Sequence, residues 1–325
     1  FGGMAKKIIV IVLVLGALVG GLAILLKNEQ ANVTDGSPDG ALLNVVTTST
    51  MVTDMVRAIG GERVAVHGLM GPKVDPHSFK VNASATTALL KADLVFYSGL
   101  HLEGKMQDTL EKRAAEKKDA FALTDGIPKE ELLKPQEEFV GYHDPHVWGN
   151  PELWAHCLDV VVEQLSKADP EGADEYEMKA EFYYDELMEL HEWAKKRMTE
   201  VPEGQRVLVT SHDAFYYFGK AYGFEVRGLQ GVSTNSEAGL KDRAELVAFI
   251  KERKLKTIFP ESSVNAKGIK AVAAEAGVSV SAHELFSDAM GNPGEMVTLH
   301  GETYDKGTYI GMIKHNVNTI VDGLK

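Results

Sequence analysis

Short apolar segments alternate along most of the chain with longer segments in which apolar residues recur every three or four positions. The short segments predict buried β-strands, and the longer ones predict amphipathic helices. Strands are predicted at residues 43–48, 63–69, 93–99, 206–210, 225–229, 256–260 and 278–285. Helices are predicted at residues 51–60, 83–92, 151–167, 237–253 and 307–324. This alternation is typical of α/β proteins, in which helices cover both faces of parallel sheets.

One much longer helix is predicted in the middle of the chain, beginning at Asp169 and Pro170. Asp and Pro are favoured at the first positions of a helix. Roughly 27 residues would span about 40 Å, which is enough to cross a whole domain. Acidic residues at its start and basic residues at its end suit the helix dipole. Its apolar stripe consists of Tyr176, Ala180, Tyr183, Leu187, Leu190, Ala194 and Met198.

This helix divides the other predicted elements into two sets, so we expect two parallel-sheet lobes joined by one long rigid helix. The N-terminal α/β lobe is predicted at residues 42–168 and the C-terminal α/β lobe at residues 201–325. The connecting helix is predicted within residues 169–200. Because ligands bind at the carboxyl ends of parallel strands, we expect a site between the lobes.

A strongly apolar run precedes the lobes. Residues 8–26 are 19 uncharged residues that follow Lys6 and Lys7. As a helix the run would span about 28 Å, close to the hydrocarbon thickness of a bilayer. The lysines favour a cytoplasmic N-terminus with the rest of the chain exported. We expect residues 1–30 to be a membrane anchor, with a cleaved signal peptide as the alternative, and residues 31–41 to be a polar tether.

The composition of the chain mainly excludes certain partners and kinds of site. The 325 residues include 34 Lys and Arg against 47 Asp and Glu, which gives a formal net charge of −13. Because nucleic-acid binding depends on basic residues that neutralise phosphates, this balance argues against a nucleic-acid partner. The lone cysteine, Cys157, rules out an internal disulfide and a Cys-rich zinc site. We expect an extracytoplasmic monomer.

Three histidines and one aspartate are the main candidates for chemistry. His77, His212 and Asp288 come after predicted strands, and His146 lies in the segment HDPHVW. Three imidazoles and a carboxylate can bind a borderline divalent ion such as Zn²⁺ or Mn²⁺. The four residues are 69, 66 and 76 residues apart, and no short motif joins them. Their spacing alone therefore does not decide whether these four residues share one metal site.

Two of these histidines lie in identical D-P-H triplets. Proline fixes the backbone dihedral φ directly before His77 and His146, which stiffens both loops. Asp75 and Asp144 can then cap the adjacent backbone or accept a hydrogen bond from the imidazole. The alternative interpretation is that each D-P-x sequence only opens a turn, as it commonly does.

Several stretches of the chain resemble the solute-binding proteins of zinc/manganese ABC transporters, the TroA/ZnuA type. The matching stretches are VDPHSF (74–79), ADLVFYSGLHLE (92–103), DPHVW (144–148), 207–234, FPESS (259–263), ELFSDAMG (284–291) and 307–324. They follow the family's order through nearly everything after the tether. The resemblance implies two α/β lobes around one metal ion, which is captured outside the cytoplasmic membrane and delivered to an ABC permease.

Carried over by motif, the implied metal ligands are His77, His146, His212 and Asp288, two from each lobe. Manganese-specialised members that resemble this chain tend to carry Glu at the position of His212, and a third imidazole favours zinc. Zinc-specialised members often have a His-rich loop before the second D-P-H triplet, whereas only His143 precedes it here. Zinc is therefore the expected cargo, with manganese as the alternative.

Two other function classes stay open from the sequence. A metal-dependent hydrolase would need an open coordination position and a general base, for which Glu261 or Asp213 could be nominated. A metal-binding adhesin is the second alternative. A four-ligand shell around the metal is closed, however, and suits storage or transfer better than hydrolysis. We therefore expect a transport protein without a catalytic step.

Overall fold

The computed structural model describes residues 43–134 and 142–325, which belong to one compact unit. The predicted anchor at residues 8–26 and the predicted tether at residues 31–41 lie outside the described residues. Within the described ranges, no helix has both the length and the apolar character needed to cross a membrane.

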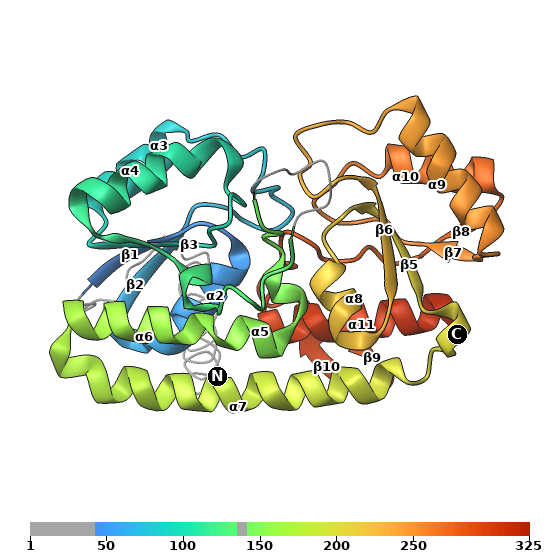
Figure 1. Ribbon diagram of the computed structural model, residues 1–325. Coiled ribbons are helices and arrows are strands. Elements are labelled where there is room, and N and C mark those ends of the chain that lie inside the picture. The colour runs from blue at the N-terminus through green and yellow to red at the C-terminus, as the bar shows by residue number, and fades with distance from the viewer. Residues whose placement is uncertain (1–42, 135–141) are drawn as a thin grey trace, which may run out of the picture. The chain divides into compact units, whose positions relative to one another are not determined.

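The N-terminal lobe contains a parallel four-stranded sheet with the order β2-β1-β3-β4 (Figure 1). Its strands are β1 (Leu43–Thr47), β2 (Val64–Gly68), β3 (Leu94–Tyr97) and β4 (Ala120–Ala122). Its helices are α2 (Thr50–Gly60), α3 (Ala83–Lys91), α4 (Gln107–Lys117), α5 (Pro151–Ala155) and α6 (Cys157–Ala168). Ser49 caps α2 directly after β1, because its side chain accepts a hydrogen bond from the backbone N–H of Val52.

The C-terminal lobe is built on two parallel strand pairs. The first pair is β5 (Val207–His212) with β6 (Glu225–Gln230), and the second is β7 (Thr257–Ile258) with β8 (Ser279–Val280). The backbone N–H of Phe259 donates to the Val209 carbonyl over 2.9 Å and links the pairs. The helices of this lobe are α8 (Tyr216–Tyr222), α9 (Leu240–Glu252), α10 (Lys267–Ala276) and α11 (Tyr309–Leu324).

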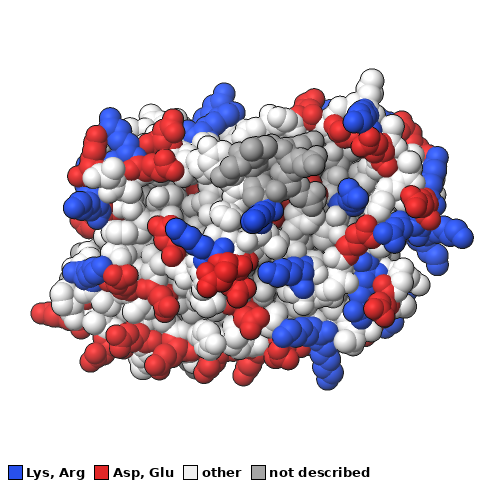
Figure 2. All heavy atoms as spheres, viewed as in Figure 1, with Lys and Arg blue, Asp and Glu red and all other residues white. Residues whose placement is uncertain are grey.

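Helix α7 (Ala173–Met198) has 26 residues and runs along both lobes (Figure 1). It contacts α2, α5 and α6 of the N-terminal lobe and α8 and α11 of the C-terminal lobe. Every residue of the predicted apolar stripe is buried, which confirms the predicted periodicity. Its first turn is acidic and its last turn is basic. Figure 2 accordingly shows acidic side chains along the lower edge of this face, where Figure 1 places α7. The predicted fold class, two parallel-sheet lobes and one long helix, is therefore confirmed.

The predicted start of this helix is wrong in one respect. Gly172, and not Asp169, is the cap of α7. The carboxylate of Asp169 instead accepts hydrogen bonds from Arg63 over 2.7 and 2.9 Å and from the Tyr176 hydroxyl over 2.7 Å. The Asp169 side chain thus ties the turn before α7 to the N-terminal lobe.

Several other elements differ from the sequence predictions. The helix predicted at 151–167 is broken at His156. The backbone N–H of His156 donates to the carbonyl of Leu153, three residues before it, and not to the carbonyl four residues before it as in an α-helix. The strands predicted at 256–260 and 278–285 shrink to two residues each. An antiparallel hairpin of β9 (Met296–Leu299) and β10 (Glu302–Asp305) was not predicted, because its strands have only four residues each and are largely exposed or half-buried.

Candidate metal centre

The structure brings the four candidate residues together at one point between the lobes. One ligand atom of each lies within 4.8 Å of all the others, and the members are His77, His146, His212 and Asp288. No side chain in this group is more than 1% exposed. Residues separated by up to 211 positions in the chain (77 to 288) therefore form one enclosed cluster, which we call the cage.

Three of the four residues of the cage, His77, His212 and Asp288, lie at or after the carboxyl end of a parallel strand. His77 lies in the loop between β2 and α3, and His146 directly precedes the short turn Val147–Gly149. Asp288 follows β8 and the bridge between Glu261 and Leu285. His212 was predicted to follow a strand, but it is the last residue of β5 itself. The register pairs it with Gln230 and fixes its backbone.

The ligand atoms face one another across short gaps. Nε2 of His77 lies 3.3 Å from Nε2 of His146. The carboxylate oxygens of Asp288 lie 3.3 Å from Nε2 of His146 and 3.2 Å from Nε2 of His212. Among the described residues, Nε2 of His212 and both oxygens of Asp288 have no hydrogen-bond partner, although they are buried. Buried polar atoms are costly without a partner, and a cation at the centre would satisfy them together.

A carboxylate behind His146 holds its ring. Oδ1 of Asp144 accepts a hydrogen bond from the backbone N–H of His146 over 2.9 Å and lies 2.8 Å from its Nδ1. A bond at Nδ1 fixes the tautomer and leaves Nε2 free to bind a metal. The suggestion from the D-P-H triplet that this aspartate supports the histidine is therefore confirmed for His146.

The other D-P-H triplet is arranged differently. Oδ1 of Asp75 accepts a hydrogen bond from the backbone N–H of His77 over 2.9 Å. Its Oδ2 accepts hydrogen bonds from the hydroxyls of Ser78 and Thr234, each over 2.7 Å. Because Thr234 belongs to the C-terminal lobe, Asp75 connects the lobes directly beside the cage.

Glu261 supports His212 in the same way that Asp144 supports His146. The Glu261 carboxylate accepts from the backbone N–H of His212 over 2.9 Å and lies 2.5 Å from its Nδ1. Sequence reasoning considered Glu261 only as a general base and missed this role. Its position after a strand, in FPESS, was the available clue. Because both carboxylate oxygens contact His212, Glu261 is not a free base.

Electrostatics favour positive charge at the centre of the cage. Burial disfavours a charged His146, but the carboxylates of Asp144 and Asp288 outweigh burial and raise its pKa to about 9. Burial also opposes a charged His212, yet Asp288 and Glu261 hold its pKa well above the usual value. Burial would raise the pKa of Asp288, but His212 and His146 hold it well below the usual range. The carboxylate is therefore ionised and ready to bind a cation.

His77 behaves differently from the other two imidazoles. Burial lowers its pKa to about 4, helped by the neighbouring rings of His146 and His212 and opposed by Asp288. Its ring is neutral at pH 7, which is the state that binds metal ions. Asp288 and His77 are thus already in the protonation states that bind a metal ion, an ionised carboxylate and a neutral imidazole.

Other residues singled out in the sequence lie elsewhere. The ring of His101 is packed against Tyr142, and its centroid lies 3.8 Å away. Asp213 accepts a hydrogen bond from the backbone N–H of Gly228 over 2.6 Å. Cys157 is buried, and burial holds the pKa of its thiol well above the usual value. None of these three belongs to the cage.

Two α/β lobes along one long helix, with a closed cage of four donor groups between them, suit a binding protein that encloses a small cation. A sequence model of the family described as "ZnuA: Zinc-uptake complex component A periplasmic" matches residues 45–323. The chain belongs to this ZnuA family.

Relatives agree with this assignment over nearly the whole chain. The manganese-binding lipoprotein MntA of Bacillus subtilis is 45% identical over 87% of this chain and 90% of its own length. The zinc-binding protein TroA of Treponema pallidum is 41% identical over 98% of both chains. These relatives are named as binding proteins, so the chain is a solute-binding protein and not an enzyme.

Solved structures share the fold. The structure of the periplasmic zinc-binding protein TroA matches with a TM-score of 0.80 and 41% identity, covering 87% of this chain and 99% of that one. The laminin-binding protein Lmb of Streptococcus agalactiae, described as bifunctional with adhesin and metal-transporting activity, matches with a TM-score of 0.71 and 26% identity. It covers 87% of this chain and 100% of that one.

Proposed function

We propose that this chain captures a divalent metal ion outside the cytoplasmic membrane and delivers it to the permease of an ABC import system. The observation that carries the proposal is the convergence of three imidazole Nε2 atoms and the Asp288 carboxylate in one buried cage. Among the described residues, Nε2 of His212 and both oxygens of Asp288 have no hydrogen-bond partner, which suits a removable cation better than a permanent structural contact.

The proposed ligands are His77, His146, His212 and Asp288, and the proposed cargo is Zn²⁺ or Mn²⁺. Three nitrogen ligands and one oxygen ligand fit zinc, which favours imidazole and four-coordination. Manganese favours a larger share of oxygen ligands. The relatives support both ions, because one is named for manganese and another for zinc. Zinc is the cargo that this set of ligands favours.

The proposed setting of the protein follows from its sequence and its relatives. We infer that residues 8–26 tether the chain to the cytoplasmic membrane, since this uncharged apolar run after Lys6 and Lys7 is long enough to span a bilayer as a helix. The domain boundaries that go with this proposal are 42–168, 169–200 and 201–325. The working form is a monomer, and its protein partner is the permease.

An adhesin role is a second candidate, supported by the laminin-binding neighbour with the same fold. It would use the surface of the protein and is compatible with metal transport. Binding of the purified chain to immobilised laminin tests it. Saturable binding would support this role, and binding no greater than to albumin would oppose it.

Metal uptake by intact cells tests the main proposal. Cells that express the chain with its permease should accumulate ⁶⁵Zn²⁺ or ⁵⁴Mn²⁺ faster than cells without the chain. The Asp288→Ala variant should reduce uptake to the background rate, because it removes the only anionic ligand. Uptake that is equal with the variant and the wild type would contradict the proposal.

A further inference from the structure

Trp148 lies where the two halves of the cage meet. It is two residues after His146, and its ring centroid lies 5.3 Å from that of His146. Its indole Nε1–H donates a hydrogen bond to the Ser287 carbonyl over 2.7 Å, directly before Asp288. Trp148 is 3% exposed. One buried side chain of the N-terminal lobe therefore touches a ligand from its own lobe and the loop of a ligand from the other lobe.

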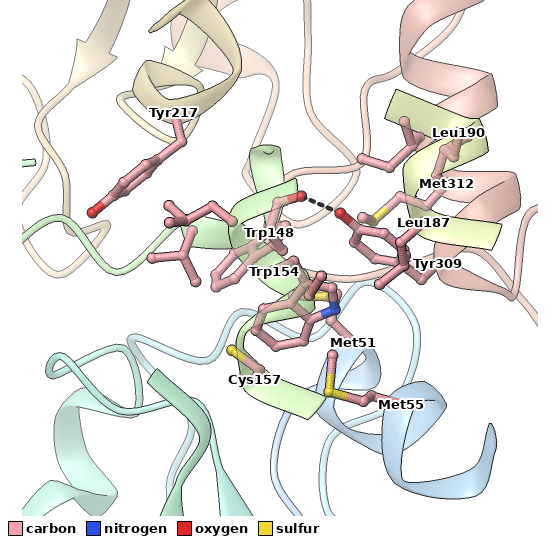
Figure 3. Close-up of a cluster of buried hydrophobic side chains, with 14 of the residues drawn as sticks. Met51, Met55, Trp148, Trp154, Cys157, Leu187, Leu190, Tyr217, Tyr309 and Met312 are labelled. Atoms are coloured by element: carbon pink, nitrogen blue, oxygen red, sulfur yellow. Dashed lines mark hydrogen bonds between the residues drawn. The ribbon is translucent and has the colours of Figure 1, made fainter. Parts of the chain in front are cut away.

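The Trp148 backbone is tied to the C-terminal lobe as well. Its carbonyl accepts a hydrogen bond from the Tyr309 hydroxyl over 2.7 Å, and Figure 3 shows this bond as a dashed line. Tyr309 begins α11 and is stacked on Trp154, with 6.2 Å between ring centroids. The turn that carries His146 is thus anchored in the same core as α11.

Apart from their approach to Nε2 of His146 and of His212, over 3.3 and 3.2 Å, the oxygens of Asp288 have no hydrogen-bond partner among the described residues, so the position of the carboxylate otherwise depends on its loop. The side-chain amide of Asn316 pairs with both the N–H and the carbonyl of Phe286, over 2.8 and 2.7 Å. The backbone N–H of Met290 donates to the Thr50 hydroxyl over 2.9 Å. Asn316 belongs to the C-terminal lobe, whereas Thr50 and Trp148 belong to the N-terminal lobe.

We propose that the Trp148 indole N–H is a positioning group that holds the Asp288 loop against the His146 turn and so sets how slowly the metal ion leaves the cage. This inference rests on the proposed metal-binding function and extends it. Without the bond to Ser287, the carboxylate can move away from His146 and His212 together with its loop. The metal would then lose its anionic ligand first.

The chain offers a matched control for this role. Trp154 is also a buried tryptophan of the same core, drawn beside Trp148 in Figure 3. Its Nε1 has no hydrogen-bond partner among the described residues. Trp148→Phe and Trp154→Phe therefore remove similar volumes from one core, but only the first also removes a hydrogen bond to the Asp288 loop.

The test uses the full-length chain loaded with Co²⁺, whose visible absorption reports the geometry of its ligands. Metal transfer to an excess of chelator gives the dissociation rate, and thermal unfolding of the metal-free proteins gives their stability. Trp148→Phe should release Co²⁺ about 10–100-fold faster than the wild type, the range found when support of a metal ligand is lost. It should also change the Co²⁺ spectrum, whereas Trp154→Phe should change only the melting temperature.

A second pair of variants covers a failure of Trp148→Phe to fold. Thr50→Val removes the hydrogen bond to Met290 and should also speed the release of Co²⁺. Thr53 lies in the same helix, but its hydroxyl donates to the Ser49 carbonyl and not to the Asp288 loop, so Thr53→Val should leave the release rate unchanged. Equal release rates and spectra for Trp148→Phe and Trp154→Phe would overturn the role of the Trp148 indole. Equal release rates for Thr50→Val and Thr53→Val would overturn the premise that contacts of the Asp288 loop with the N-terminal lobe set the release rate. A wild-type chain that binds no Co²⁺ would overturn the proposed function as well, so the two failures are distinguishable.

Discussion

The carboxylate of Glu261 holds His212 at two atoms, the backbone N–H and the ring Nδ1. This double contact turns Nε2 of His212 toward the cage. Glu261 also forms a parallel bridge with Leu285, three residues before Asp288. Glu261 therefore fixes the imidazole ligand His212, and its backbone pairs with the segment directly before Asp288.

Removing the charge of Glu261 should weaken metal binding. In Glu261→Gln the amide can still contact the backbone of His212, but it no longer stabilises the proton on Nδ1. We expect the zinc affinity to fall about 10–100-fold, as is usual when a carboxylate behind a metal-bound histidine is lost. Competition with a fluorescent zinc chelator measures this change.

The matched control is Glu284→Gln, which alters an exposed carboxylate in the same region. It should leave the zinc affinity within about twofold of the wild type, since exposed charges interact weakly with a buried site. If Glu261→Gln behaved like this control, Glu261 would have no part in orienting the ligand.

Replacing His212 by glutamate should shift the metal preference. His212→Glu exchanges a nitrogen ligand for an oxygen ligand, which favours manganese relative to zinc. The ratio of zinc to manganese affinities, measured by competition titration, should fall at least about tenfold. An unchanged ratio would mean either that His212 is not a ligand or that ligand type does not decide the preference.

Metal binding should become weaker as the pH falls. In the metal-free protein the pKa of His146 is raised to about 9 and the pKa of His212 is raised well above its usual value, which favours a second proton on each ring, at the Nε2 atom that the metal would bind. A metal ion must displace these protons, so the apparent affinity should rise from pH 6 to pH 8. Calorimetric titration in buffers of different ionisation enthalpy should also detect protons released on binding. Binding without proton release at pH 7 would contradict these pKa shifts.

A separate pH effect concerns the stability of the fold. Burial lowers the pKa of His315 to about 4, and its Nε2 lies 3.0 Å from the Glu284 carbonyl. The unfolded chain takes up this proton near pH 6.5 and the folded chain only near pH 4, so stability is lost as the pH falls between these values. A shift of this size corresponds to about 3 kcal/mol.

Chemical unfolding of the metal-free protein across pH 4 to 7 measures this loss. His315→Gln lacks the titrating group, so its free energy of unfolding should fall by less than that of the wild type over the same range. Parallel curves for the two proteins would show that His315 does not contribute to acid instability.

Local sequence predicted those features that repeat or lie next to one another in the chain. The stripe from Tyr176 to Met198 consists of seven residues at successive spacings of three or four, and each member is buried. Asp144 and His146 are two residues apart, so their hydrogen bond could be anticipated from the D-P-H triplet. The candidate ligands could be nominated because they follow strands or lie in such triplets.

Contacts between distant residues could not be predicted in this way. Glu261 and His212 are 49 residues apart, so their pairing depends on how the C-terminal lobe folds. Trp148 and Ser287 are 139 residues apart, and their pairing depends on how the two lobes pack. The hairpin of β9 and β10 escaped prediction because its strands are short and half-exposed. The turn at His300 and Gly301, both with positive φ, is typical of a hairpin, but no strand was predicted on either side of it.

The most direct test of the central claim is the metal content of the purified full-length chain. Inductively coupled plasma mass spectrometry after reconstitution with zinc and manganese should find about one metal ion per chain in the wild type. The His77→Ala/His146→Ala double variant should retain almost none, because it loses two of the four proposed ligands. A wild-type chain without metal, or a double variant that retains it fully, would contradict the proposed cage.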